Sequence, residues 1–167
     1  MTGFFTLFYK ELLRFWKVSF QTILAPIVST LLYLLIFSHI LESRVEVYPG
    51  ISYTQFLIPG LIIMAILQNA FANSSSSLIQ SKISGNIIFV LLSPLSYFEF
   101  LGAYLLASVI RGLLVGLGVF IMVLQFYEVP TQFPLWIVLF VLFGSMLLGT
   151  LGIIAGICSD KFDQLAA

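Results

Sequence analysis

The sequence predicts an all-α protein, a polytopic membrane helix bundle with four spanning helices in its 167 residues. Hydrophobic residues make up 60% of the chain and charged residues only 8%, with a mean hydropathy of +1.13. A soluble domain carries about a quarter of its residues charged. The few charges also gather in short groups and leave long apolar segments between them. Most of the surface is therefore expected to face lipid or other protein.

Four segments are long enough to cross a bilayer, at residues 18–40, 56–77, 100–126 and 134–158. The first carries no formal charge and would span about 34 Å as a helix, against a hydrocarbon core of about 30 Å. It is also longer than the hydrophobic region of a secretory signal peptide, about 7–15 residues. We therefore expect it to be a retained helix.

Lysine and arginine are distributed unevenly between the two sides of these segments. Only Arg44 falls on one side. The other side carries Lys10, Arg14, Lys17, Lys82 and Lys161. By the positive-inside rule, the N-terminus and the connection after the second segment are expected in the cytoplasm.

Residues 1–17 are predicted to form an amphipathic interface helix. At about 100° per residue, four charges fall within an arc of about 120°. They are Lys10, Glu11, Arg14 and Lys17. Such a helix is expected to lie in the membrane plane with its basic side chains toward lipid phosphates. It could serve as an anchor, as a contact for a cytoplasmic partner, or as both.

Polar side chains within the spanning segments mark a possible pathway or helix contacts. Arg111 lies about 16 Å into the third segment, where an arginine costs about 2.5–3.5 kcal/mol and should face protein or water. Gln68, Asn69 and Asn73 are expected to share one face of the second segment. Each of these residues could either hydrogen-bond a neighbouring helix or line a substrate path.

Small residues recur at four-residue spacing in the last two segments. The steps are Ser108, Gly112 and Gly116, then Ser145 with Gly149, and Gly152 with Gly156. Such stripes allow helix backbones to approach closely in lipid. Pro26 and Pro59 are expected to bend their helices.

Several classes of function are not supported by the sequence. The net charge of zero gives no reason to expect a nucleic-acid partner. No phosphate-binding GxxxxGK[ST] motif, acidic pair within a spanning segment, or nucleophile–base pattern occurs. His39 is the single histidine and Cys158 the single cysteine, so no metal site is predicted. Any energy for uphill transport is expected to come from another subunit.

The connection at residues 81–98, which contains NIIFVLLSPLSYFEF, is the most informative stretch. Its apolar part, Ile87 to Leu92, is far too short to span a membrane. Pro94 should stop a helix begun at Asn86, and the next helix should restart near Tyr97. We expect a short apolar helix on the cytoplasmic face that fits a socket on a soluble protein. The alternative is a re-entrant or surface-lying loop that only connects two helices.

This connection resembles that of the type-2 permeases of ATP-binding-cassette (ABC) exporters. The shared pattern is a glycine, a short apolar helix, a Ser-Pro-Leu-Ser turn, an acidic residue and a later Arg-Gly pair. The matching residues are Gly85, Leu91, Leu92, Ser93, Pro94, Leu95, Ser96, Glu99, Arg111 and Gly112. The KEL-R start of the chain, at Lys10, Glu11, Leu12 and Arg14, and FLIPGL at 56–61 are similar as well.

The resemblance implies a permease subunit of a bacterial cytoplasmic (inner) membrane, moving an amphipathic drug, lipid or polysaccharide outward. It implies a separate ATPase partner that binds ATP and Mg²⁺, with no cofactor in this chain, and a homodimer of permeases in the lipid bilayer. The expected ATPase-coupling residues are Gly85, Asn86, Ile87, Phe89, Leu91, Leu92, Ser93, Pro94 and Glu99.

Two features depart from the family pattern. Asn86, Ile87 and Ile88 stand where a charged residue is common, which predicts a more apolar contact with the ATPase. The transmembrane domain is assigned to residues 18–167. Because the family fold has six helices, a C-terminal part of this domain is expected to be missing. The alternative function is a non-transporting membrane scaffold or assembly factor.

Overall fold

The structure is a computed structural model of the whole chain, and it describes residues 2–41, 46–48, 51–127 and 133–166. Its elements in chain order are α1 (Thr2–Leu41), β1 (Glu46–Tyr48), β2 (Ile51–Ser52), α2 (Tyr53–Ile83), α3 (Ile87–Leu92), α4 (Tyr97–Leu124), α5 (Pro134–Cys158) and α6 (Asp163–Ala166). Arg44, the predicted charge of the outer side, and Met1 lie outside the described residues.

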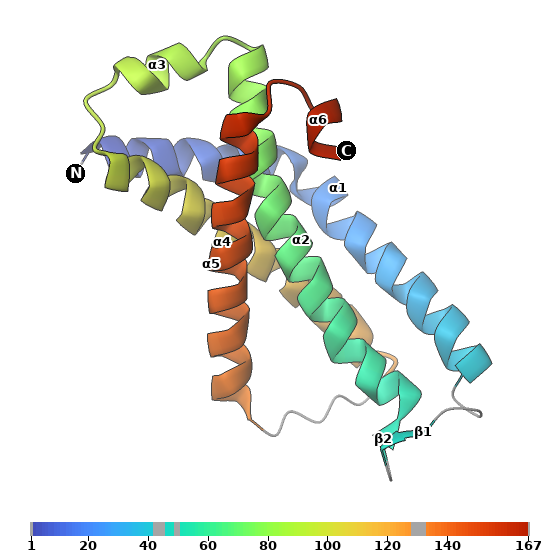
Figure 1. Cartoon of the computed structure of the whole chain (residues 1–167). Coiled ribbons are helices and arrows are strands. Elements are labelled where there is room, and N and C mark those ends of the chain that lie inside the picture. The colour runs from blue at the N-terminus through green and yellow to red at the C-terminus, as the bar shows by residue number, and fades with distance from the viewer. Residues whose placement is uncertain (1, 42–45, 49–50, 128–132, 167) are drawn as a thin grey trace.

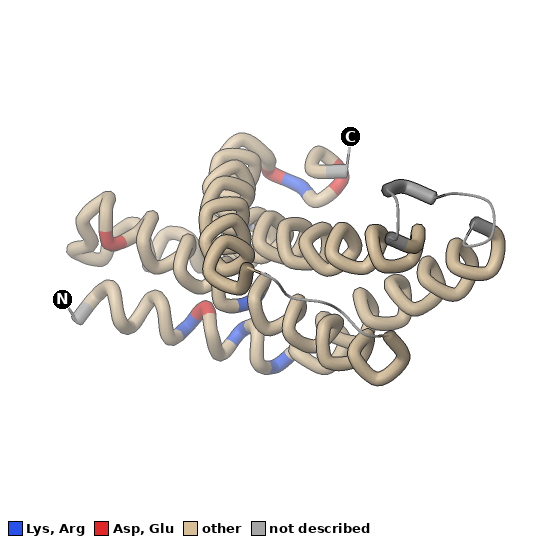
Figure 2. The backbone as a smooth tube through the Cα atoms, turned by 90° about the horizontal axis from the view of Figure 1, so that it is seen from below, with Lys and Arg blue, Asp and Glu red and all other residues tan. Residues whose placement is uncertain are grey.

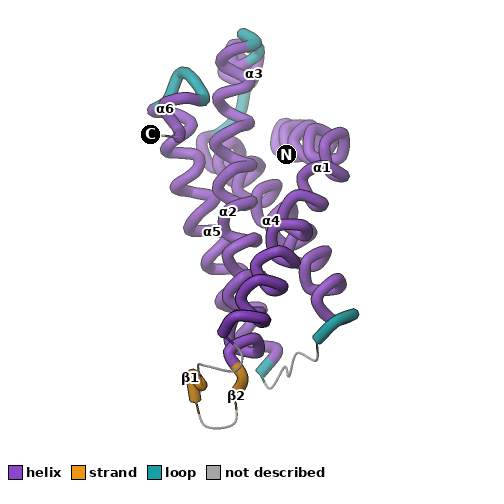
Figure 3. Tube along the Cα trace, turned by 90° about the vertical axis from the view of Figure 1, so that its right-hand side faces the viewer, coloured by secondary structure: helices purple, strands orange, loops and turns teal. Residues whose placement is uncertain are grey.

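The predicted helix bundle is confirmed. Within the described parts of the chain, four helices are long and apolar enough to cross a membrane, namely α1, α2, α4 and α5. The strands β1 and β2 form a short antiparallel hairpin before α2, at the opposite end of the molecule from α3 (Figure 3). Ser52 then caps α2, because its hydroxyl accepts a hydrogen bond from the Gln55 backbone N–H.

The first helix differs from the prediction of an interface helix over 1–17 followed by a spanning helix over 18–40. The structure has one continuous helix, α1, which changes direction, so that its N-terminal part crosses the bundle and the rest runs along it (Figure 1). The hydroxyls of Ser19 and Thr22 each donate to a backbone carbonyl about one turn earlier, at 2.8 Å, and Pro26 follows. Both features bend helices without ending them.

The middle of the bundle is formed by α2 and α4, and each of these packs against both α1 and α5. Two buried clusters hold the four helices together. One contains Leu34, Ile58, Ala65, Val115, Val119 and Val123. The other lies at the end that carries α3 and contains Leu7, Leu78, Ala103, Tyr104 and Ile153.

The small-residue stripes lie at close helix contacts, as predicted. A Cβ atom added to Gly152 would lie 2.5 Å from the Phe71 backbone oxygen of α2. One added to Gly112 would lie 2.9 Å from the Ile66 backbone oxygen. Glycine is required at such positions because any side chain would force the backbones apart. The Ser74 hydroxyl adds a hydrogen bond of 2.8 Å to the Gly149 carbonyl.

Charged residues gather along the N-terminal part of α1 and at the end of the bundle that carries α3 and α6 (Figure 2). Lys82, at the end of α2, donates to the carbonyls of Ile157 and Ser159 at 2.6 and 2.9 Å. Its ammonium group therefore caps the C-terminus of α5, where helix carbonyls lack partners and the helix dipole favours a cation.

Candidate functional site

The turn between α2 and α3 depends on one glycine. Gly85 has φ +72°, a left-handed conformation that L side chains rarely adopt. The Gly85 and Ser84 backbone N–H groups donate to the Lys82 and Gln80 carbonyls, which closes the last turn of α2. The chain can then reverse within three residues and begin α3 at Ile87.

The turn between α3 and α4 depends on local hydrogen bonds. The Ser93 hydroxyl donates to the Val90 carbonyl at 2.6 Å, and Pro94 follows directly. The Ser96 N–H donates to the Glu99 carboxylate at 3.0 Å and completes a capping box at the start of α4. The predicted short helix that stops before Pro94 and restarts at Tyr97 is confirmed.

The two sides of α3 have different surroundings. Ile87 and Val90 pack against the buried cluster at this end of the bundle. The side chains on the other side are exposed, Phe89 by 74% and Leu92 by 78%. We call the exposed set the α3 surface. It consists of Ile88, Phe89, Leu91 and Leu92 of α3, together with the exposed Tyr97 and Phe98 at the start of α4.

Exposed apolar side chains are ordinary on a spanning helix, where lipid covers them, but α3 is different. Its six residues reach about 9 Å as a helix, less than a third of a hydrocarbon core. Figure 1 shows α3 beyond the bundle rather than within it. An exposed apolar patch of this kind marks a site for contact with another protein or with the membrane surface.

The N-terminal part of α1 supports this region. Phe4 and Phe8 pack with Ile87, Val90 and Leu95 around the same buried cluster. The first turn of α1 also lies close to the turn after α3, because a Cβ atom on Gly3 would come 2.5 Å from Leu95 Cδ2. Two of the regions predicted to contact a partner are thus neighbours in space.

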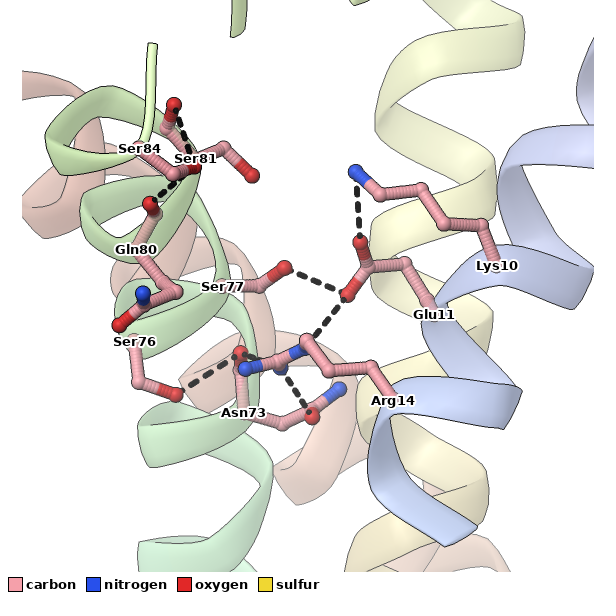
Figure 4. A network of polar contacts seen from close by, with 9 residues as sticks. All are labelled: Lys10, Glu11, Arg14, Asn73, Ser76, Ser77, Gln80, Ser81 and Ser84. Atoms are coloured by element: carbon pink, nitrogen blue, oxygen red, sulfur yellow. Dashed lines mark hydrogen bonds and ion pairs between the residues drawn. The ribbon is translucent and has the colours of Figure 1, made fainter. Parts of the chain in front are cut away.

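A polar cluster lies below this region, between α1, α2 and α4. It consists of Lys10, Glu11, Arg14, Asn73, Ser77 and Arg111. The Glu11 carboxylate is at its centre and has 0% exposure. It accepts a hydrogen bond of 2.5 Å from Ser77, pairs with Arg14 Nε at 3.3 Å and lies 3.5 Å from Lys10 Nζ (Figure 4).

Asn73 joins two arginines within this polar cluster. Arg14 Nη2 donates to both the backbone oxygen and Oδ1 of Asn73, each at 2.9 Å. Arg111 Nη1 donates to the same Oδ1 at 3.1 Å. The Arg111 guanidinium also lies over the Phe15 ring, 5.7 Å from its centroid. Arg111 therefore has protein partners on α1 and α2, namely Phe15 and the Asn73 side-chain amide. A hydrogen bond to a neighbouring helix was one of the two alternatives that the sequence left open for Arg111.

The charged arc of the N-terminal helix is only partly directed as predicted. Glu11 and Arg14 face α2 rather than lipid phosphates, because Ser77 and Asn73 offer the hydrogen bonds that a buried carboxylate and a half-buried guanidinium require. Lys10 and Lys17 are exposed. This corrects the expectation that the Arg14 side chain lies toward lipid phosphates.

The polar residues of α2 do not act as one stripe. Gln68 is exposed and lines a groove of about 710 Å³ with Gly60, Met64, Phe71 and Leu148. The Asn69 amide donates to the Ala65 carbonyl of its own helix at 3.0 Å. Of these three residues, Asn73 is the one that reaches α1 and α4, through Arg14 and Arg111. A second groove, of about 700 Å³, lies between α2, α4 and α5 and is mostly apolar.

Sequence reasoning placed Ser77 on the polar face of the second segment, but it assigned no partner to Ser77 or to Lys82. Ser77 lies one turn after Asn73, so its reach toward the same neighbour follows from helical spacing once that neighbour is known. In the sequence, Lys82 served only as one of the positive charges that set the expected orientation. Among the described residues, no three His, Cys, Asp or Glu side chains gather in a way that could hold a metal ion.

Comparison with known proteins gives a consistent result. The family model described as "ABC-2 type transporter" matches residues 2–167. Proteins named "Inner membrane transport permease YadH" from Escherichia coli strain K12 and from Shigella flexneri are each 32% identical to the chain over 159 residues. The match covers 94% of this chain and 61% of each relative. A search of solved structures finds no match.

Proposed function

This chain belongs to the ABC-2 type transporter family, and we propose that it acts as the transmembrane permease subunit of an ABC exporter. The chain spans 61% of the length of the curated relatives that it matches. The proposal therefore concerns the whole protein to which these residues contribute.

The α3 surface is the observation that carries the proposal. It is apolar, exposed and too short to span, and it is held by a glycine turn, a proline and a capping box. A separate ATPase subunit is proposed to dock there. The N-terminal part of α1 would form a second contact, since it packs against the turn after α3.

ATP and Mg²⁺ would be bound by that partner, because the 167 residues contain no phosphate-binding loop motif. In this proposal the chain itself is not an enzyme, and two permeases pair about a two-fold axis. Closure of the ATPase would push on α3 and the start of α4, and the close contacts of α4 with α1 and α2 would carry that movement into the bundle.

The proposed orientation places α3, α6 and the N-terminus in the cytoplasm. Lys10, Arg14 and Lys17 lie in the N-terminal part of α1, Lys82 lies at the end of α2 before α3, and Lys161 lies between α5 and α6. The relatives are named as inner membrane permeases, which supports a multi-pass protein of the bacterial inner membrane. The substrate class we propose is amphipathic, a drug, lipid or polysaccharide, since the two grooves along α2 are mostly apolar.

The test is co-purification of the full-length protein with its ATPase, using Phe89→Asp in α3. Phe162→Asp is the matched control, because Phe162 is an exposed phenylalanine outside α3, directly before α6. We expect Phe89→Asp to lose the ATPase and substrate-stimulated ATP hydrolysis, while Phe162→Asp keeps both.

The outcomes separate the proposal from its alternative. Retention of the ATPase by Phe89→Asp would overturn the proposed docking site. If Phe89→Asp loses a protein partner but the wild type shows no substrate-stimulated hydrolysis, a membrane scaffold or assembly factor would be favoured.

Cys158, which is exposed at the end of α5, tests orientation. In intact cells it should react only with membrane-permeant thiol reagents, with Cys158→Ser as the background.

A further inference from the structure

The N-terminal part of α1 has a second face that the bundle does not cover. Five large side chains on it are exposed, and they follow one another at steps of three or four residues, which places them on one side of a helix. Trp16 is exposed by 72% and Phe20 by 80%. We call this set the aromatic stripe. It consists of Phe5, Tyr9, Leu13, Trp16 and Phe20.

The orientation of this stripe is fixed by the opposite face of the helix. Leu7, Glu11 and Phe15 are buried and follow one another at steps of four residues. At about 100° per residue, these positions lie roughly opposite the aromatic stripe. The hydrogen bonds of Glu11 and Arg14 to α2 and the packing of Leu7 hold this face to the bundle. The stripe therefore points away from the bundle.

Positive charge flanks the stripe on one side. Lys10 and Lys17 are exposed and lie seven residues apart, two helical turns, so their side chains project in nearly the same direction. Glu11 is the single acidic residue of α1, and its carboxylate is turned into the protein. Lys10 is paired with Glu11 at 3.5 Å, whereas Lys17 forms no ion pair within the described residues. The exposed surface of this part of α1 therefore combines aromatic side chains with a net positive charge, since Lys10, Arg14 and Lys17 outnumber Glu11.

We infer that the aromatic stripe, with Lys10 and Lys17, forms a binding site for anionic phospholipid headgroups. Tryptophan and tyrosine prefer the level of the headgroups, where an apolar ring and a polar group can both be accommodated. Lysines at that level attract anionic lipids, by about fivefold in affinity for each lysine. Two lysines beside one stripe give a preference for anionic over zwitterionic lipid.

The continuity of α1 is the reason to choose lipid as the occupant rather than protein. The same unbroken helix continues into a membrane span, so the stripe lies where the chain leaves the bilayer. Trp16 lies just before the expected span at 18–40, and Phe20 lies in its first turn. A soluble partner could reach the stripe only by displacing lipid from it. This inference goes beyond the proposed function and holds for a transporter or a scaffold alike.

The test uses quenching of Trp16 fluorescence by brominated lipid. The full-length protein is placed in bilayers with every tryptophan except Trp16 replaced by phenylalanine, Trp136 among them. Brominated phosphatidylglycerol is compared with brominated phosphatidylcholine at equal fractions. We expect both lipids to quench, with phosphatidylglycerol favoured about tenfold or more, and the preference to weaken as salt is raised.

Lysine variants provide the decisive comparison. Lys10→Gln with Lys17→Gln should reduce the preference to about one, while Lys17→Arg should keep it. Lys161→Gln is the matched control, since Lys161 is an exposed lysine outside α1, between α5 and α6. Equal quenching by the two lipids in the wild type would overturn the inference. Absence of quenching by either lipid would also overturn it and would mean that protein covers the stripe.

Discussion

The two helix interfaces of α2 are built from different kinds of contact. Toward α1 and α4, α2 presents Asn73 and Ser77, which hydrogen-bond charged side chains. Toward α5, it presents backbone and Ser74 to glycines that approach closely. The first interface needs particular partner atoms, and the second needs the absence of side-chain volume. The first should therefore be sensitive to removing groups, and the second to adding them.

This difference follows from where each interface lies. The polar cluster is at the end that carries the charges, where Lys10 and Arg14 are still partly exposed to solvent or headgroups. Charged groups cost less there than at the centre of the bilayer. The α2–α5 contact extends along apolar helices, where close backbone packing is the available source of stability. Substitutions in the two interfaces test this contrast.

The largest effect is expected from Gly152→Val in the α2–α5 interface. The new side chain would meet the Phe71 backbone oxygen, 2.5 Å from its Cβ, and backbone cannot move aside cheaply. We expect a loss of about 3 kcal/mol in the free energy of unfolding, measured by titration into denaturing detergent. Gly60→Val is the matched control, because nothing lies within 4 Å of a Cβ there, and it should change stability by about 0.5 kcal/mol or less. Similar losses for both variants would contradict the close-packing account.

The next effect is expected from Glu11→Ala in the polar cluster. Removal of this buried carboxylate leaves Arg14, Lys10 and Ser77 without their shared acceptor. We expect a loss of about 2 kcal/mol in the free energy of unfolding by the same measurement. Lys17→Ala, an exposed charge on the same helix, should stay within about 0.5 kcal/mol of the wild type. A neutral Glu11→Ala would show that the cluster does not stabilise the α1–α2 contact.

A smaller effect is expected from Asn73→Ala, because Arg14 keeps its bond to the backbone oxygen at position 73. The loss should be about 1 kcal/mol. The sharper measurement is a double-mutant cycle with Arg111→Met, whose guanidinium donates to Asn73 Oδ1. The two losses should not add, since each variant removes the same hydrogen bond. Strict additivity would mean that the two side chains do not interact.

The smallest effect is expected from Lys82→Met, which removes the cap on the C-terminus of α5. The apolar part of the side chain is retained, while the bonds to the Ile157 and Ser159 carbonyls and the exposed ion pair with Asp160 at 3.5 Å are lost. We expect a loss of about 0.5 kcal/mol, together with faster amide hydrogen exchange in the last turn of α5. Unchanged exchange there would show that water replaces the ammonium group fully.

Local signals in the sequence were sufficient to predict the region around α3. Gly85, Pro94, Ser96 and Glu99 act on the residues beside them, through backbone conformation and short-range hydrogen bonds. The length of α3 and the start of α4 could therefore be read directly. The four spanning helices were equally predictable, because hydropathy reports transfer into lipid and needs no knowledge of neighbours.

The direction in which polar side chains face was not predictable in the same way. Periodicity placed Lys10, Glu11, Arg14 and Lys17 on one arc, but it does not say which part of that arc meets protein. Glu11 turns inward because Ser77 lies opposite, 66 residues later in the chain. For the same reason, Gln68 and Asn73 were expected on one face although they reach different neighbours.

The close approach of Gly3 to Leu95 has a practical consequence for handling the protein. A fluorescent protein or purification handle fused ahead of residue 2 would emerge beside the α3 surface, where it would obstruct whatever binds there. A tag inserted at the hairpin β1–β2, at the opposite end of the bundle from α3, would avoid that obstruction (Figure 3).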